Sequence, residues 1–132
     1  MVSAVTIGLR NARFAGEHRS GCVCVFAGAT SGIGAGTLKK LVTMLDAPTI
    51  YVIGRSAKGF VDQQKTLESL NPTCKIVFIE AEFSLLSNVD AVCKQIAAAE
   101  QKVDYLFMSA GMMPLNAPEC TFLSVYTYFN EC

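Results

Sequence analysis

The chain of 132 residues has no tryptophan, one histidine and no long apolar run. A helix that spans a membrane needs about 18 or more consecutive apolar residues, so the sequence predicts no membrane contact of that kind. Basic and acidic residues number 11 each. This balance indicates neither a nucleic-acid-binding surface nor a disordered acidic tail. The N-terminal segment has no continuous apolar core ahead of its arginines, so we expect a cytoplasmic protein without a signal peptide.

The cysteines show no spacing typical of a metal site. No two of them form a C-x-x-C motif, and the single histidine, His18, is distant from all of them in the sequence. The six cysteines are Cys22, Cys24, Cys74, Cys93, Cys120 and Cys132. We expect buried, reduced thiols that act as small apolar side chains, and no metal ligands. Cys22 and Cys24 are two residues apart, so a strand would place both on one face.

Apolar residues make up 52% of the chain, which is ample for a core. Four short apolar runs read as strands, at residues 22–28, 49–54, 74–81 and 103–111. They are continuous rather than alternating, which indicates burial on both faces, as in a parallel sheet covered by helices.

Helical patterns separate these runs. The predicted helices span 35–45, about 58–70, and a segment that begins near Ser87, where Asp90 three residues later suggests a capping box. The residues expected on their inner faces are Leu38, Leu41, Val42 and Leu45, then Phe60, Leu67 and Leu70, then Val89, Val92, Cys93 and Ile96.

The resulting order β-α-β-α-β-α-β predicts an α/β fold. Right-handed crossovers favour a Rossmann-like, doubly wound parallel sheet of about four strands in the order 3-2-1-4. We divide the chain into an N-terminal arm (1–20), a dinucleotide-binding half-domain (21–111) and a divergent C-terminal tail (112–132).

A cluster of glycines, "AGATSGIGAG" at 27–36, lies at the first strand-to-helix turn. A helix N-terminus at that place offers unpaired N–H groups and the positive end of a dipole, which suits a pyrophosphate. Gly28 permits a tight exit from the strand, and Gly32 and Gly34 allow a close approach of backbone and phosphates. A merely tight turn is the alternative interpretation.

The end of the second strand indicates which cofactor is bound. Enzymes that use NAD place a carboxylate there for the ribose 2′-hydroxyl, but "VIGRSAKG" has none. Arg55 takes the place, with Ser56 and Lys58 beside it, and a guanidinium suits the 2′-phosphate of NADP. The sequence therefore favours NADP over NAD, the alternative being an ordinary surface arginine.

These motifs resemble those of the short-chain dehydrogenases/reductases. "AGATSGIG" (27–34) is similar to the family's T-G-x-x-x-G-x-G, with Ala27 in the threonine place, and "MSAG" (108–111) is similar to its N-N-A-G. The opening of the chain, with "NAR" at 11–13, resembles reductase-like members from filamentous fungi, many of which serve specialised metabolism. The cofactor-binding residues that the motifs and this resemblance imply are Gly28, Thr30, Ser31, Gly32, Ile33, Gly34, Arg55, Ser56, Glu82, Ala110 and Gly111.

The resemblance also implies catalytic groups that the sequence lacks. The family uses a tyrosine with a lysine four residues later, and none of Tyr51, Tyr105, Tyr126 and Tyr128 has one. We predict no catalytic residue in this chain and expect an NADP(H)-binding, oxidoreductase-like protein that transfers hydride to or from a carbonyl or alcohol only by family resemblance. The alternatives are a non-catalytic module that binds a nucleotide or a partner, and an inactive product of a truncated gene.

The fourth strand has a further consequence. In the order 3-2-1-4 it is an edge, and residues 104–110 contain neither proline nor lysine to discourage pairing. We expect self-association or a protein partner at this edge.

Overall fold

The structure, a computed structural model, describes residues 2–111. The predicted C-terminal tail, with Cys120 and Cys132, lies outside these residues. The elements in chain order are α1 (Ala4–Gly16), β1 (Val23–Ala27), α2 (Gly32–Val42), β2 (Thr49–Gly54), the 3₁₀ turn η1 (Lys58–Phe60), α3 (Val61–Leu70), β3 (Lys75–Glu80), α4 (Leu86–Ala99) and β4 (Tyr105–Met108).

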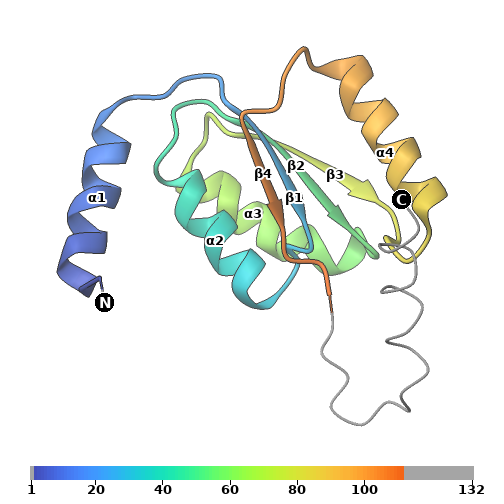
Figure 1. The fold of residues 1–132 in the computed structure, drawn as a ribbon, viewed down its shortest axis with the longest axis horizontal. Helices are drawn as coiled ribbons and strands as arrows, with labels where there is room; N and C mark the ends of the chain where they lie inside the picture. The colour runs from blue at the N-terminus through green and yellow to red at the C-terminus, as the bar shows by residue number, and fades with distance from the viewer. Residues whose placement is uncertain (1, 112–132) are drawn as a thin grey trace, which may run out of the picture.

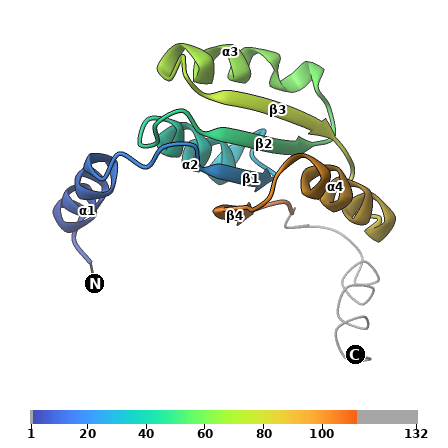
Figure 2. The same cartoon turned by 90° about the horizontal axis from the view of Figure 1, so that it is seen from above.

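The four strands form one parallel sheet in the order β3-β2-β1-β4, as predicted (Figure 2). Phe26 of β1 is in register with Val52 of β2 on one side and with Phe107 of β4 on the other. The rings of Phe26 and Phe107 stack at a centroid distance of 4.6 Å, which ties the edge strand to the sheet.

The sheet is the middle of three layers, with α2 and α3 on one face and α4 on the other (Figures 1 and 2). On one face, Leu38 and Val42 of α2 and Leu67 of α3 form a buried cluster with the even-numbered positions of β1 and β2. On the other face, Val92 and Ile96 of α4 pack with the alternate positions of the same strands. Successive side chains of β1 and β2 point to opposite faces of the sheet, and helices cover both faces, which explains why these strands are apolar throughout.

The edge strand β4 departs from this pattern. Its register pairs Leu106 with Val25 and Met108 with Ala27, so both side chains lie on the sheet face that α4 covers elsewhere. Leu106 is 59% exposed and Met108 79% exposed. The prediction of burial on both faces is therefore correct for β1 and β2 but wrong for β4, because no described helix lies over the face that carries Leu106 and Met108.

Two helix boundaries differ from the predictions. The helix expected at 35–45 is α2, which begins at Gly32 and ends at Val42. The capping box predicted at Ser87 is wrong, because α4 begins at Leu86 with Leu85 at the N-cap position. The entry to α4 is instead held by Asn88, whose side-chain amide donates to the carbonyl oxygen of Glu82 at 2.9 Å.

Two residues predicted on inner helix faces are exposed. Leu70 is 43% exposed because the chain leaves α3 at that residue, and Leu67 makes the contact with the core. Cys93 of α4 is exposed as well, because Val92 and Ile96 are the positions that face the sheet. The other predicted inner-face residues are buried or half-buried.

The described cysteines only partly follow the prediction of buried thiols. Cys24 and Cys74 are buried, and burial raises the pKa of the Cys24 thiol to about 12 and that of Cys74 to about 11. Cys22 is half-buried against the same cluster as Cys24, as its spacing predicts, whereas Cys93 is exposed. Within residues 2–111, no group of three or more His, Cys, Asp or Glu side chains is arranged to hold a metal ion.

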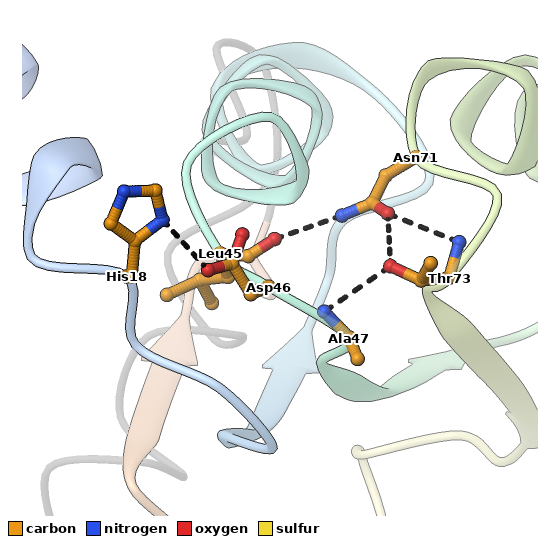
Figure 3. A network of polar contacts seen from close by, with 6 residues as sticks. All are labelled: His18, Leu45, Asp46, Ala47, Asn71 and Thr73. Carbon is orange, nitrogen blue, oxygen red and sulfur yellow. Dashed lines mark hydrogen bonds and ion pairs between the residues drawn. The ribbon is translucent and has the colours of Figure 1, made fainter.

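A polar network joins the loops at the amino ends of the strands (Figure 3). The Asn71 side-chain amide donates to the carbonyl oxygens of Val42 and Leu45 at 2.9 Å each, which caps the C-terminal end of α2. Its oxygen accepts from the Thr73 hydroxyl, which in turn accepts from the backbone N–H of Ala47. In the same region His18 contacts Asp46 at 3.1 Å. These residues precede the strands, so the network stabilises the fold at the end away from the glycine loop.

The N-terminal arm contains a helix, α1, beside one end of the sheet (Figure 1). Phe14 packs edge-on against Tyr105 of β4 at a centroid distance of 6.2 Å, and the Arg19 guanidinium lies over the Phe14 ring. None of the helices formed by residues 2–111 combines the length and apolar character required to cross a bilayer.

Candidate functional site

A groove of about 620 Å³ lies at the carboxyl ends of the strands. The residues that line it come from the glycine loop, the end of β2, the segment after β3 and the segment after β4. They are Gly28, Thr30, Ser31, Gly32, Ile33, Gly34, Ile53, Gly54, Arg55, Ala81, Glu82, Phe83, Ser84, Ser109, Ala110 and Gly111. Every residue predicted to bind a cofactor, except Ser56, lines this groove. In parallel α/β sheets the carboxyl ends of the strands are where ligands bind.

Gly28 forms the tight exit from β1 that the sequence predicts. Its φ of +88° is a conformation that side chains disfavour, and its N–H donates to the carbonyl oxygen of Ile53 at 3.2 Å. A Cβ at this position would lie 2.5 Å from the Cα of Ala110. The glycine loop therefore packs directly against the backbone that follows β4.

Gly34 lines the groove and also packs tightly against its neighbours. A Cβ there would lie 3.0 Å from the Cα of Ala29 and would collide with the carbonyl oxygen of Gly28 and the hydroxyl of Ser109. The space that a side chain at Gly34 would occupy is filled by protein. Gly34 permits the close packing of α2 on the ends of β1 and β4.

Gly32 fits the predicted role in nucleotide binding. Its φ is +58°, and no heavy atom of the described protein lies within 4 Å of the place a Cβ would occupy. It is the first residue of α2, and the Ser31 side chain at the N-cap makes no capping hydrogen bond. An open cradle beside uncapped N–H groups at a helix N-terminus fits a pyrophosphate.

Two side chains hold the glycine loop in place. The Ser109 hydroxyl donates to the carbonyl oxygen of Gly28 at 3.1 Å. The Gln63 side-chain amide, from α3, donates to the carbonyl oxygen of Ala29 at 2.9 Å. The loop is thus anchored by Ser109 from the β4 side and by Gln63 from the α3 side, and Ala29 within it is fully buried.

Arg55 follows directly after β2 and is exposed at the rim of the groove. No acidic side chain within residues 2–111 forms an ion pair with its guanidinium. It also lines a second hollow of about 410 Å³, together with Glu80 and Glu82 and residues of α4 such as Asn88. A cation thus lies where the two hollows meet.

Ser56 lies apart from the groove. Its hydroxyl accepts a hydrogen bond from the N–H of Gly59 at 3.4 Å, within the turn that leads into α3. Glu82 is exposed and lines both hollows, as expected from its place after β3.

Several residues of the site were not predicted from the sequence. Ser109 departs from the family motif, although its position at the end of the fourth strand is a signal that it faces the site. Gln63 and Glu80 act through side-chain hydrogen bonds to the loops after β1 and β2. No local pattern in the sequence marks either of them.

Known proteins resemble the chain in both sequence and fold. The family described as short chain dehydrogenase matches residues 22–127, a match that extends beyond Gly111. The oxidoreductase lepF of Aspergillus flavus is 40% identical over 120 residues, which cover 91% of this chain and 32% of that protein. An oxidoreductase of Emericella nidulans is 40% identical over 115 residues, which cover 87% of this chain and 34% of that protein. The chain thus spans about a third of the length of these relatives.

Solved structures share the fold. A metagenomic short-chain oxidoreductase in complex with NADP matches with a TM-score of 0.67 at 22% identity, covering 78% of this chain and 45% of that one. The L-sorbose reductase of Gluconobacter frateurii, complexed with NADPH and L-sorbose, matches with a TM-score of 0.66 at 19% identity, covering 80% and 40%. The sheet order, the glycine loop and the family match agree, and the chain belongs to the short-chain dehydrogenase family.

Proposed function

We propose that this chain binds a nicotinamide dinucleotide in the groove and prefers NADP(H) to NAD(H). The observation that carries the preference is Arg55, which follows β2 at the rim of the groove where an NAD enzyme would have a carboxylate. A guanidinium can hold a 2′-phosphate through two parallel hydrogen bonds. The solved NADP and NADPH complexes that share this fold are consistent with the proposal.

The groove has separate places for the parts of such a cofactor. The N–H groups at the start of α2, beside Gly32, would hold the pyrophosphate, and Arg55 would hold the 2′-phosphate. Glu82 and the backbone after β4, at Ala110 and Gly111, would line the remaining part. When bound, the nicotinamide supplies or accepts the hydride in the interconversion of a carbonyl and an alcohol.

Cofactor binding is the activity that we propose for these 132 residues, and hydride transfer the activity of the family to which they belong. The chain contains no tyrosine with a lysine four residues later, and general acid–base help of this kind is worth about 10²–10⁴-fold in rate. We therefore expect binding without turnover. The identity to fungal oxidoreductases supports a fungal reductase, and its place in specialised metabolism stays a prediction.

The test is a titration of the whole chain with NADPH and NADH, with cofactor fluorescence as the readout, followed by an NADPH-oxidation assay against a panel of aldehydes and ketones. Tighter binding of NADPH with no oxidation above the no-protein rate is the expected result. Equal affinity for both cofactors would remove the NADP preference. Stereospecific oxidation of NADPH would show that catalytic groups exist in this chain.

The edge position of β4 among residues 2–111 supports a proposal about assembly. Within these residues β4 pairs with β1 alone, and Leu106 and Met108 expose apolar surface. An unpaired edge with exposed apolar side chains favours pairing with another strand. We propose that a second copy of this chain occupies this edge, and that the protein is cytoplasmic.

A further inference from the structure

Two consecutive residues at the end of β3 hold the segment that carries Arg55. The N–H of Ala81 donates to the carbonyl oxygen of Gly54 at 2.9 Å, just before Arg55. The carboxylate of Glu80 accepts a hydrogen bond from the N–H of Ala57 at 2.9 Å, just after Ser56. Arg55 and Ser56 are thus fixed at both ends by the neighbouring strand.

The contact at Ala57 depends on one side chain. The first of the two contacts joins two backbones and belongs to the sheet, so almost any sequence can make it. The second uses the Glu80 carboxylate, and Ala57 is the N-cap residue of η1, which has no side-chain cap of its own. An unpaired N–H at the start of a helical segment is well satisfied by a carboxylate.

We propose that Glu80 is a positioning residue for 2′-phosphate recognition, because its carboxylate holds Ala57 and thereby fixes the direction in which Arg55 leaves β2. The proposal rests on the proposed function, in which Arg55 binds that phosphate. Arg55 is exposed and has no acidic partner among the described residues, so the backbone on either side is what orders it. A long side chain on an ordered backbone loses less freedom when it binds a ligand.

The role of Glu80 as an acceptor can be separated from its charge. Glu80→Gln keeps an oxygen that can accept from Ala57 but removes the negative charge, whereas Glu80→Ala removes both. Glu80 and Arg55 line the same hollow, so a negative charge there opposes the binding of a phosphate. The acceptor alone is required by the proposal, and Glu80→Gln should bind a 2′-phosphate as well as the unchanged protein does, or better.

The experiment measures the affinities of adenosine 2′,5′-bisphosphate and adenosine 5′-monophosphate by calorimetry on the full chain. Glu80→Ala should weaken the bisphosphate by about five- to tenfold, the equivalent of one hydrogen bond, and the monophosphate by less than about twofold. Glu80→Gln should retain the affinity for both. Asp90→Ala removes an exposed carboxylate that accepts no hydrogen bond within the described residues, and serves as the matched control.

Amide hydrogen exchange at Ala57 gives a readout that needs no ligand. Glu80→Ala should accelerate this exchange, and Glu80→Gln and Asp90→Ala should leave it unchanged. Unchanged exchange in Glu80→Ala, an equal loss of both ligands, or a Glu80→Gln variant as weak as Glu80→Ala would each overturn the proposal. If the unchanged protein binds both ligands equally, the NADP preference fails, and the exchange rate of Ala57 still decides whether Glu80 holds this segment.

Discussion

Ser109 and Gly28 join the last described strand to the glycine loop. The Ser109 hydroxyl donates to the Gly28 carbonyl oxygen at 3.1 Å, and the Ser109 N–H donates to the carbonyl oxygen of Ala27 at 2.9 Å. The same hydroxyl also occupies space against which Gly34 packs. One small side chain thus sets the spacing between β4, the loop and α2.

Replacement of Ser109 by alanine tests this link. We expect Ser109→Ala to lower the free energy of unfolding by about 0.5–1.5 kcal/mol, the usual net value of one hydrogen bond, and to weaken dinucleotide binding. Ser87→Ala, on an exposed position of α4 that caps nothing, is the matched control. Urea denaturation of the two variants gives the comparison, and equal stability of both would show that the hydroxyl contributes nothing.

Replacement of Arg55 tests the cofactor preference. Arg55→Ala should cost about 1.5–3 kcal/mol of NADPH binding, as expected for a hydrogen bond to a charged group, and should leave NADH affinity nearly unchanged. Lys65→Ala, which removes an exposed cation from α3, controls for the change in net charge. Fluorescence titration with each cofactor measures the effect. A parallel loss of affinity for NADPH and NADH would contradict a role in 2′-phosphate binding.

Two glycines of α2 provide a comparison of packing. Gly34→Val should destabilise the protein by more than the roughly 1–3 kcal/mol typical of overpacking, because its new atoms meet backbone at Gly28 and Ala29. Gly36→Val should be tolerated, since no atom of residues 2–111 outside its own helix lies within 4 Å of a Cβ there. Thermal melting followed by circular dichroism distinguishes them, and similar melting temperatures would show that the Gly34 contact is not tight.

The cysteines predict a pattern of alkylation and a dependence on pH. Iodoacetamide at pH 8 should modify Cys93 in the folded protein but reach Cys24 and Cys74 only after unfolding, with the sites assigned by mass spectrometry. The pKa values of these two buried thiols lie near 12 and 11, above the ordinary value of 9.0. The two thiols therefore lose their protons at a lower pH in the unfolded chain than in the folded one. The free energy of unfolding should consequently fall as the pH rises from about 9 towards 12.

Charge on the edge strand tests self-association. Leu106→Lys and Met108→Lys place cations on exposed positions of β4, where lysine is known to discourage edge pairing. Sedimentation velocity at micromolar concentration should show larger species for the unchanged chain and a shift towards monomer for the variants. Lys94→Ala, on the exposed side of α4, should leave the distribution unchanged. A monomeric unchanged chain would remove the basis for the proposed edge contact.

The sheet could be predicted from the sequence because each strand is marked by its own short apolar run, and four such runs occur along the chain. Runs such as "TIYVIG" at 49–54 are apolar throughout, and the handedness of the crossovers then leaves few orders. The boundaries of α2 could not be predicted in this way. Glycine is a poor helix former, yet α2 begins at Gly32 because the packing of Gly34 on β1 and β4 outweighs that propensity.

The candidate site was predictable where backbone conformation demands a residue type. Gly28 is such a residue, because it needs a positive φ. Arg55 could be predicted for another reason, because it follows the second strand at the position where NAD-dependent enzymes have a carboxylate. Gln63 and Glu80 leave none, because each donates to or accepts from a backbone group that is distant in the sequence. Ser87 shows the converse, a local capping pattern that the longer-range contact between Asn88 and Glu82 replaces.

The bond between Ser109 and Gly28 spans 81 residues, and this separation sets an order of events during synthesis. A ribosome completes the glycine loop early, but Ser109, one of the two side chains that hold the loop, is made only after β4. Until then the loop lacks its contact with the β4 side, and β1 has no partner strand on that side. Contacts between distant residues form slowly because chain closure must come first. A nascent chain that ends before Ser109 would carry the whole glycine motif but lack one of the hydrogen bonds that hold the loop.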